Sequence, residues 1–171
     1  GSVLWLLDEN AVAANNLRRE AESRGVAPAR LVFAKRMELP EHLARHQMAD
    51  LFLDTLPCNA HTTASDALWA GLPLLTCLGE TFPGRVAASL LAAVGLSELI
   101  AHSLQEYEAR ALELAANSRE LLALRQKLIA NRSSTPLFNT ALFATHLEVA
   151  YQAMWSRYLE GLPPEHIHIA P

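Results

Sequence analysis

The polar residues with the clearest chemical potential stand in "CNAHTTASDALWAGLP", Cys58 through Pro73. A histidine, two threonines and an aspartate accompany the start of an apolar helical run. The stretch follows an expected strand, "DLFLDT" (50–55), and in an open parallel α/β sheet ligands bind beyond the carboxyl ends of the strands. A helix N-terminus there offers free backbone N–H groups and the positive end of the helix dipole. Phosphate oxygens are the natural guests of such a position.

The individual side chains fit a phosphate and sugar ligand, but they also fit a helix cap. Thr62 and Thr63 would add hydroxyl donors, and the carboxylate of Asp66 would accept from sugar hydroxyls, as acids do for ribose. On the structural alternative, Thr63-x-x-Asp66 is a variant of the capping box that opens many ordinary helices. His61 taken alone is more often a hydrogen-bonded loop residue than a functional one.

A second group of residues lies in "MELPEHLARHQ" (37–47). His42 and Arg45 are three apart on an expected helix and therefore share a face. Because guanidinium and imidazole groups both stack on π systems, the pair could line a planar base; the alternative is a solvated helix face. A third segment, "LGETFPGRVAAS" (78–89), could be a ligand-binding turn, but a plain strand-to-helix turn is the favoured interpretation.

These residues must be positioned by short apolar strands that alternate with helices over the first two-thirds of the chain. Strands that are apolar throughout need cover on both faces, which predicts an α/β fold with a doubly wound parallel sheet. A helical C-terminal tail begins at Gln105 and breaks at "SSTPLFN" (133–139), and an irregular end, "LPPEHIHIAP", follows. The expected strands are 3–7, 30–34, 50–55, 73–79 and 98–101, and the expected helices between them are 11–25, 40–49, 63–71 and 84–95.

Composition narrows the function classes. With 171 residues and a net charge of −4, the chain has no general reason to bind nucleic acid or an anionic membrane. Its two cysteines, Cys58 and Cys77, lack the spacing of a disulfide or zinc framework, which favours a reducing cytoplasm. No apolar stretch is long enough to span a bilayer. Phosphate-loop and Asp-x-Asp motifs are absent, so no metal site is expected, and any diphosphate must be neutralised by helix dipoles, hydroxyls and a basic side chain.

A long segment resembles a known family. "DLFLDTLPCNAHTTASDALWAGLPLLTCLGETFPGRVAASLLAAVGLSELIA" (50–101) resembles the C-terminal catalytic lobe of O-linked N-acetylglucosamine transferases, two-lobed GT-B glycosyltransferases, and a bacterial homologue is expected. The similarity extends from "SVLWLL" to "AYQAMWSRYLEG". It implies a Rossmann-like lobe over 1–102 without its first strand and helix, helices over 103–160 that pack on it and reach an absent N-terminal lobe, and an irregular tail over 161–171.

The resemblance also implies roles for single residues around the donor, UDP-N-acetylglucosamine. The diphosphate would contact Thr62 and Thr63, and the ribose would contact Asp66. The resemblance also implies that His42 and Arg45 line the uracil and that the backbone around Met37 reads the uracil edge. Cys58 and His61 would lie near the diphosphate and sugar.

The function that the resemblance implies is inverting, metal-independent and cofactor-free transfer of N-acetylglucosamine to Ser and Thr of acceptor proteins. The general base, the N-terminal lobe and helical repeats would belong to other parts of the same protein, so these residues alone are expected to be inactive. Ala60 and Leu39 depart from the Gly and Lys of better-known members. Alternatives are a nucleotide-sugar epimerase or hydrolase on the same fold, and a non-catalytic module with a vestigial site.

Overall fold

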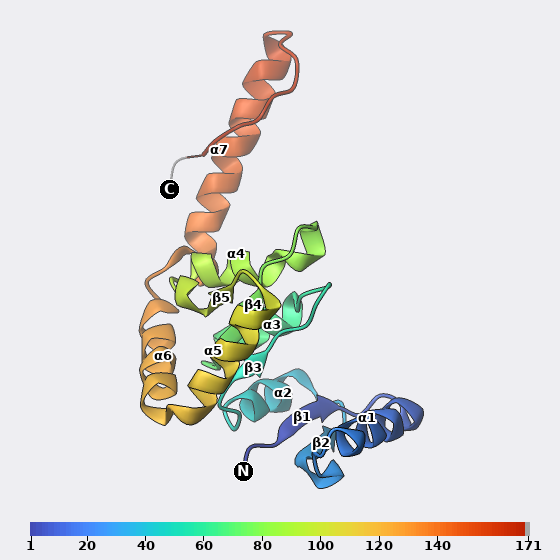
Figure 1. Ribbon diagram of the computed structural model, residues 1–171. Coiled ribbons are helices and arrows are strands. Elements are labelled where there is room, and N and C mark those ends of the chain that lie inside the picture. Colours follow the sequence, from blue (N-terminus) through green and yellow to red (C-terminus); the bar gives the residue numbers. More distant parts are fainter. Residues whose placement is uncertain (170–171) are drawn as a thin grey trace.

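The computed structural model describes residues 1–169 and has the α/β architecture that the sequence predicts (Figure 1). The strands and the helices alternate up to β5, and helices alone follow. In chain order they are β1 (Leu4–Leu7), α1 (Ala11–Ser23), β2 (Leu31–Ala34), α2 (Leu39–His46), β3 (Phe52–Leu53), α3 (Thr62–Trp69), β4 (Leu74–Cys77), α4 (Val86–Ala93), β5 (Ile100–Ala101), α5 (Leu104–Ala116), α6 (Ser118–Asn131) and α7 (Thr140–Leu159), with short 3-10 turns η1 (Pro28–Arg30), η2 (Phe82–Gly84), η3 (Ser97–Leu99) and η4 (Pro136–Phe138).

Local side chains explain where several helices begin and end. Asn10 caps α1 by accepting from the backbone N–H of Val12 at 2.8 Å. The long helical stretch predicted from residue 105 divides into α5 and α6 because Asn117 caps the second helix through the backbone N–H of Glu120. Gly71 follows α3 with φ of +85°, a conformation in which only glycine is unstrained.

All paired strands are parallel, which confirms the predicted class, but they form two hydrogen-bonded sheets. In the first, β1 pairs with β2 and Leu4 lies opposite Leu31. In the second, the order is β3-β4-β5. The carboxyl ends of β3 and β4 meet at one edge, where the loop to α3 begins.

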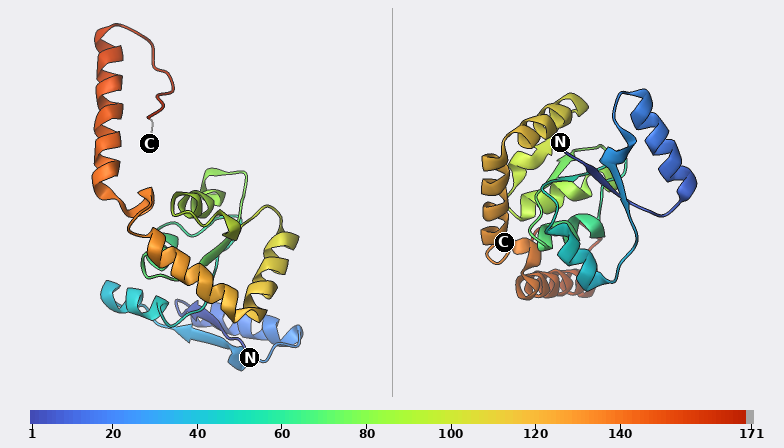
Figure 2. Two further views of the ribbon diagram at one scale, coloured as in Figure 1. Left: turned by 90° about the vertical axis from the view of Figure 1, so that its left-hand side faces the viewer. Right: turned by 90° about the horizontal axis from the view of Figure 1, so that it is seen from below.

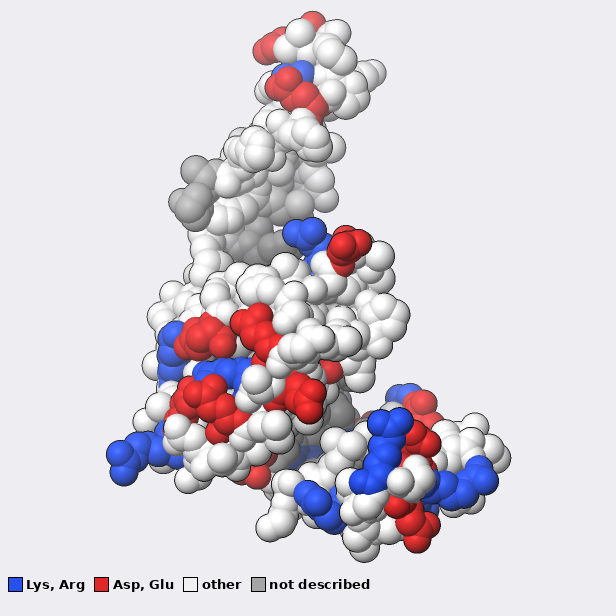
Figure 3. Space-filling view, in the orientation of Figure 1, with Lys and Arg blue, Asp and Glu red and all other residues white. Residues whose placement is uncertain are grey.

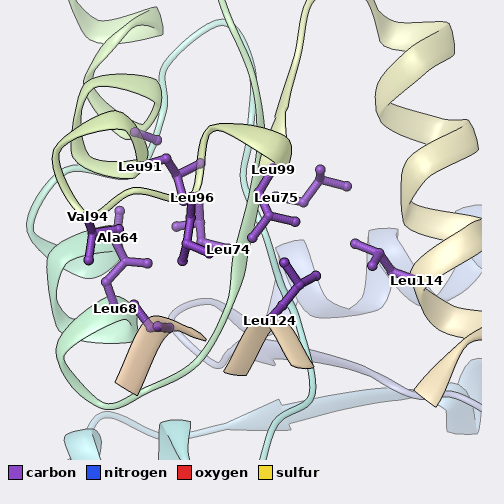
Figure 4. Close-up of a cluster of buried hydrophobic side chains, with 12 residues drawn as sticks. Ala64, Leu68, Leu74, Leu75, Leu91, Val94, Leu96, Leu99, Leu114 and Leu124 are labelled. Carbon is purple, nitrogen blue, oxygen red and sulfur yellow. The ribbon is translucent and has the colours of Figure 1, made fainter. Parts of the chain in front are cut away.

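The hydrophobic core surrounds β4, whose four residues are all buried. Figure 4 shows leucines of α3 and α4 on one side of this strand and Leu114 of α5 on the other. Helix α6 adds Leu124 and Leu128. The prediction that an apolar strand is covered on both faces is therefore confirmed for β4.

The same prediction fails for β1 and β2, whose side chains stay exposed or half-buried. Residues 1–36 contribute one buried side chain, Ala14 of α1. Helix α1 lies against the pair, and the guanidinium of Arg18 is 4.5 Å from the ring centroid of Phe33. The N-terminal strands thus have a helix beside them but little core of their own.

Helix α7 projects away from the rest of the structure, and the chain after it turns back along the helix (Figures 1 and 2). No residue of α7 is buried. Figure 3 shows few charges along the helix until its far end, where Arg157 bonds to Glu165 and to the carbonyl of Pro163. Its exposed large apolar side chains are Phe143, Leu147, Val149, Tyr151, Met154, Trp155, Tyr158 and Leu159. Within residues 1–169, no helix combines the length and the apolar character needed to cross a membrane.

Candidate functional site

The N-terminus of α3 is open to solvent and carries no side-chain cap. Thr62 and Thr63 are its first two residues and are exposed. The residue at the cap position is His61, whose side chain makes no capping hydrogen bond. The capping-box hypothesis is therefore wrong, since Thr63 lies inside the helix. The first N–H groups of an α-helix have no intrahelical partner, so this end can receive an anion.

Asp66 points toward α2, which packs on α3. One carboxylate oxygen, Oδ2, is 3.8 Å from Nε2 of His42, and each side chain is 25% exposed. The separation is too long for a hydrogen bond but short enough for electrostatic contact. Asp66 thus keeps hydrogen-bonding capacity for a group that enters beside His42.

Arg45 fixes the orientation of the His42 ring. Its Nη2 lies 3.0 Å from Nδ1 of His42. A guanidinium can only donate, so Nδ1 must accept, and in the neutral ring the proton is on Nε2, the nitrogen that faces Asp66. The three side chains form a line in which each polar group meets a complementary one.

The surroundings of His42 favour its neutral form. Burial lowers the pKa of His42 below its usual value of 6.5, and the neighbouring His46 and Arg45 lower it further, while Asp66 acts in the opposite direction. The ring of His46 stands edge-on at 4.4 Å between centroids. A neutral imidazole at this position can stack on a flat, uncharged base without an added charge.

Arg45 also joins α2 to the N-terminal strands. Its Nη1 donates to the carbonyl of Lys35 at 2.9 Å, and its guanidinium lies 5.6 Å from the ring of Trp5. The predicted sharing of a face by His42 and Arg45 is confirmed, and both are half-buried, so a freely solvated helix face does not describe them. Beside them a surface hollow of 660 Å³ follows the carboxyl ends of β1 and β2, lined by Asp8, Glu9, Lys35 and Arg36.

The turn η2 packs on the loop before α3. The carbonyl of Pro83 accepts from the backbone N–H of Asn59 at 2.9 Å and lies 3.4 Å from Nε2 of His61. The ring of Phe82 meets His61 edge-on at 6.2 Å. A Cβ at Gly84 would stand 3.0 Å from the carbonyl oxygen of Pro57, so glycine permits this close approach. The segment 78–89 therefore supports the loop that leads into α3.

The other predicted residues have less defined surroundings. Cys58 is an exposed free thiol, and its carbonyl accepts from the hydroxyl of Thr55 at 2.9 Å. Met37 is exposed on the segment between β2 and α2. Among residues 1–169, no group of three or more His, Cys, Asp or Glu side chains is arranged to hold a metal ion.

Two residues near the site were missed by the sequence reasoning. Asp54 is buried at the carboxyl end of β3, and the hydroxyl of Tyr107 donates to its carbonyl at 2.9 Å. An acid that ends an apolar strand was a usable signal for Asp54. Tyr107 gave none, because it stands 53 residues away in the sequence.

Comparison with known proteins identifies relatives along nearly the whole chain. The sequence matches the profile described as Glycosyl transferase family 41 over residues 1–147. It is 41% identical over 169 residues to the probable UDP-N-acetylglucosamine–peptide N-acetylglucosaminyltransferase SEC of Arabidopsis thaliana, covering 98% of this chain and 17% of the relative. A protein of Caenorhabditis elegans named UDP-N-acetylglucosamine–peptide N-acetylglucosaminyltransferase is 39% identical, covering 97% of this chain and 14% of the relative.

A solved structure agrees with these sequence matches. A mutant of the O-GlcNAc transferase of Thermobaculum terrenum superposes with a TM-score of 0.83 at 36% identity, covering 90% of this chain and 30% of that one. The chain described here thus spans less than a third of the length of these relatives.

Proposed function

The chain belongs to glycosyl transferase family 41, and on that premise we propose that it forms the donor-binding part of a protein O-N-acetylglucosaminyltransferase. The enzyme would transfer N-acetylglucosamine from UDP-N-acetylglucosamine to Ser and Thr hydroxyls of proteins. Support comes from the names of the relatives, two of them peptide N-acetylglucosaminyltransferases and one an O-GlcNAc transferase.

The observation that carries the proposal is the uncapped N-terminus of α3. Its first N–H groups meet no side-chain cap, and the hydroxyls of Thr62 and Thr63 are exposed beside them. A diphosphate placed there would meet hydrogen-bond donors and the positive end of the helix dipole at once. Cys58 and His61 precede the helix in the chain and would lie near the diphosphate and the sugar.

The nucleoside would lie along α2. Asp66 would accept from the ribose hydroxyls, because its carboxylate is half-buried and is not engaged in a hydrogen bond with His42 at 3.8 Å. His42 and Arg45, held together at 3.0 Å, would line the uracil, and the backbone at Met37 would read its edge. The base would then be recognised by residues of α2 and the diphosphate by residues of α3.

The chemistry requires that the charge of the departing diphosphate be stabilised while a hydroxyl attacks the anomeric carbon. Dipoles fixed at the start of α3 would stabilise that charge in the transition state without reorganisation. We propose that the transfer inverts the anomeric centre and needs no metal or other cofactor. We propose that the general base, an N-terminal lobe and helical repeats belong to other parts of the protein. Within this chain we propose a nucleotide-sugar-binding lobe over 1–102, C-terminal helices over 103–160 and an irregular tail over 161–171.

Calorimetry of the complete protein with UDP tests the binding step. We expect saturable binding of UDP and weaker binding of uridine. A protein that does not bind UDP would overturn the proposal. With UDP-N-acetylglucosamine and protein acceptors, the expected product is a glycosylated protein; release of free or isomerised sugar without protein labelling would instead identify a hydrolase or an epimerase.

A further inference from the structure

Asp54 is a buried carboxylate whose hydrogen bonds come from three different directions. Its side chain is 7% exposed. Oδ1 accepts from the backbone N–H groups of Thr55 at 2.8 Å and Ala60 at 2.6 Å, and Oδ2 accepts from the hydroxyl of Thr76 at 2.6 Å. Burial of a polar group is costly unless it is hydrogen-bonded, and here both oxygens are.

The two bonds to Oδ1 close the loop between β3 and α3. Thr55 is the first residue of that loop, and Ala60 is the residue before the cap position of α3. Within the loop, the Thr55 hydroxyl donates to the carbonyl of Cys58, and Nδ2 of Asn59 donates to the carbonyl of Thr55 at 3.1 Å. One carboxylate oxygen therefore fixes where the loop leaves the strand and where it enters the helix.

Asp54 itself is tied to the core. The backbone N–H of Asp54 donates to the carbonyl of Leu75 at 3.0 Å, and the hydroxyl of Tyr107 of α5 donates to the carbonyl of Asp54. Thr76 of β4, which bonds to the Asp54 carboxylate, is fully buried. Burial, followed by the proximity of Asp54 and Cys77, raises the pKa of Tyr107 to about 12, so the phenol keeps its proton and remains a donor. The loop between β3 and α3 is thus anchored by Asp54, a residue that contacts with β4 and α5 hold in place.

We infer that Asp54 is a positioning residue for the diphosphate site: through the N–H of Ala60 it fixes the place at which α3 presents Thr62 and Thr63. The inference rests on the proposed function. Asp54 does not touch the ligand in this scheme. Its effect is to keep the donors at the helix start in one arrangement before the diphosphate arrives, so that little ordering remains to be done on binding.

The test compares Asp54→Ser with Thr76→Val in the complete protein. Serine is too short to reach Ala60, so the helix start loses its anchor, whereas valine removes the bond to Oδ2 and leaves both loop bonds intact. We expect Asp54→Ser to weaken UDP binding by about tenfold or more while uridine binding changes less. Thr76→Val is expected to lower the melting temperature but to leave the affinity for UDP near that of the wild type.

Asp54→Asn provides the conservative rescue. Its amide oxygen can still accept from Thr55 and Ala60 while its NH₂ donates to Thr76, whose hydroxyl can also accept. UDP affinity is therefore expected to return close to the wild-type value. Equal affinities of Asp54→Ser and the wild type for UDP would overturn the inference, and so would equal losses for UDP and uridine.

Two further outcomes are separable. If the wild-type protein fails to bind UDP, the proposed function fails, and the inference falls with it. If Asp54→Ser does not fold, amide hydrogen exchange of the wild type decides. The N–H of Ala60 is expected to exchange as slowly as core amides of β4, such as that of Leu75, and exchange at the rate of an exposed loop would overturn the inference.

Discussion

Replacement of Asp66 by Asn separates recognition of the ribose from a role in folding. The variant keeps the shape of the side chain and removes its charge. The asparagine oxygen can still accept a hydrogen bond, but a neutral bond contributes about 1–1.5 kcal/mol less than a bond to a charged group, so UDP affinity should fall roughly 5- to 10-fold. The side chains of Asp66 and His42 are 3.8 Å apart and each is 25% exposed, and pairs that reach the surface contribute at most about 1 kcal/mol to folding. The free energy of unfolding of Asp66→Asn should therefore differ from that of the wild type by less than about 1 kcal/mol.

The assay is calorimetry of the complete protein with UDP and with pyrophosphate, supported by urea unfolding. Pyrophosphate has no ribose, so its affinity should not fall. Asp50→Asn is the matched control, because Asp50 is exposed at the amino end of β3 and carries the same charge. Unchanged UDP affinity, or equal losses for both ligands, would refute the assignment of Asp66 to the ribose.

The same variant has a signature that needs no ligand. Asp66 is the neighbour that raises the pKa of His42 against the effects of burial, His46 and Arg45. Its neutralisation should therefore move the pKa of His42 still lower, as measured by NMR titration of the ring protons. An unchanged pKa of His42 would show that the two side chains are not adjacent in solution.

Three other predictions follow from the same geometry. His42→Ala combined with Arg45→Ala should weaken uridine more than pyrophosphate in calorimetry, and equal losses would contradict a role at the base. Because the pKa of His42 is lower in the folded state, its contribution to stability is present above about pH 6.5 and is lost as the pH falls through the folded-state pKa. The difference in unfolding free energy between the wild type and His42→Gln, measured by urea unfolding, should therefore shrink as the pH falls. Gly84→Ala should destabilise the protein by about 1–3 kcal/mol, because its Cβ would press on the carbonyl of Pro57 at 3.0 Å, and a thermal midpoint equal to the wild type would count against that packing.

Periodicity in the sequence predicted the type and order of the elements well. The strand at 73–79 and the helix at 84–95 are present as β4 and α4; all four residues of β4 are buried, and α4 buries Ala87, Ala88 and Leu91. The strand expected at 50–55 is shorter, Phe52–Leu53, because the carboxylate of Asp54 bonds to the next backbone N–H and turns the chain away from the sheet.

The sequence predicted some contacts within the candidate site but not how its elements come together. The spacing of His42 and Arg45 placed them together, since a helix alone determines that neighbourhood. The match of Thr63 and Asp66 to a capping box was misleading, because α3 begins two residues earlier than that pattern requires. Asp54 bonds to Ala60 just before the start of α3, and it is itself held by Thr76 and Tyr107, whose contacts join distant parts of the chain and have no local pattern.

The thin core of residues 1–36 has a consequence for the energetics of ligand binding. Within residues 1–169 this segment has one buried side chain, so the amide protection of β1 and β2 should depend on contacts with other parts of the protein more than that of β4 does. Arg45 links this segment to α2 through Lys35 and Trp5, which places the residues assigned to the base at a boundary between a weakly held part and a firmly held one. The measured affinity for uridine would then be the intrinsic affinity multiplied by the fraction of molecules in which this segment is closed, and nucleotide binding would shift that population.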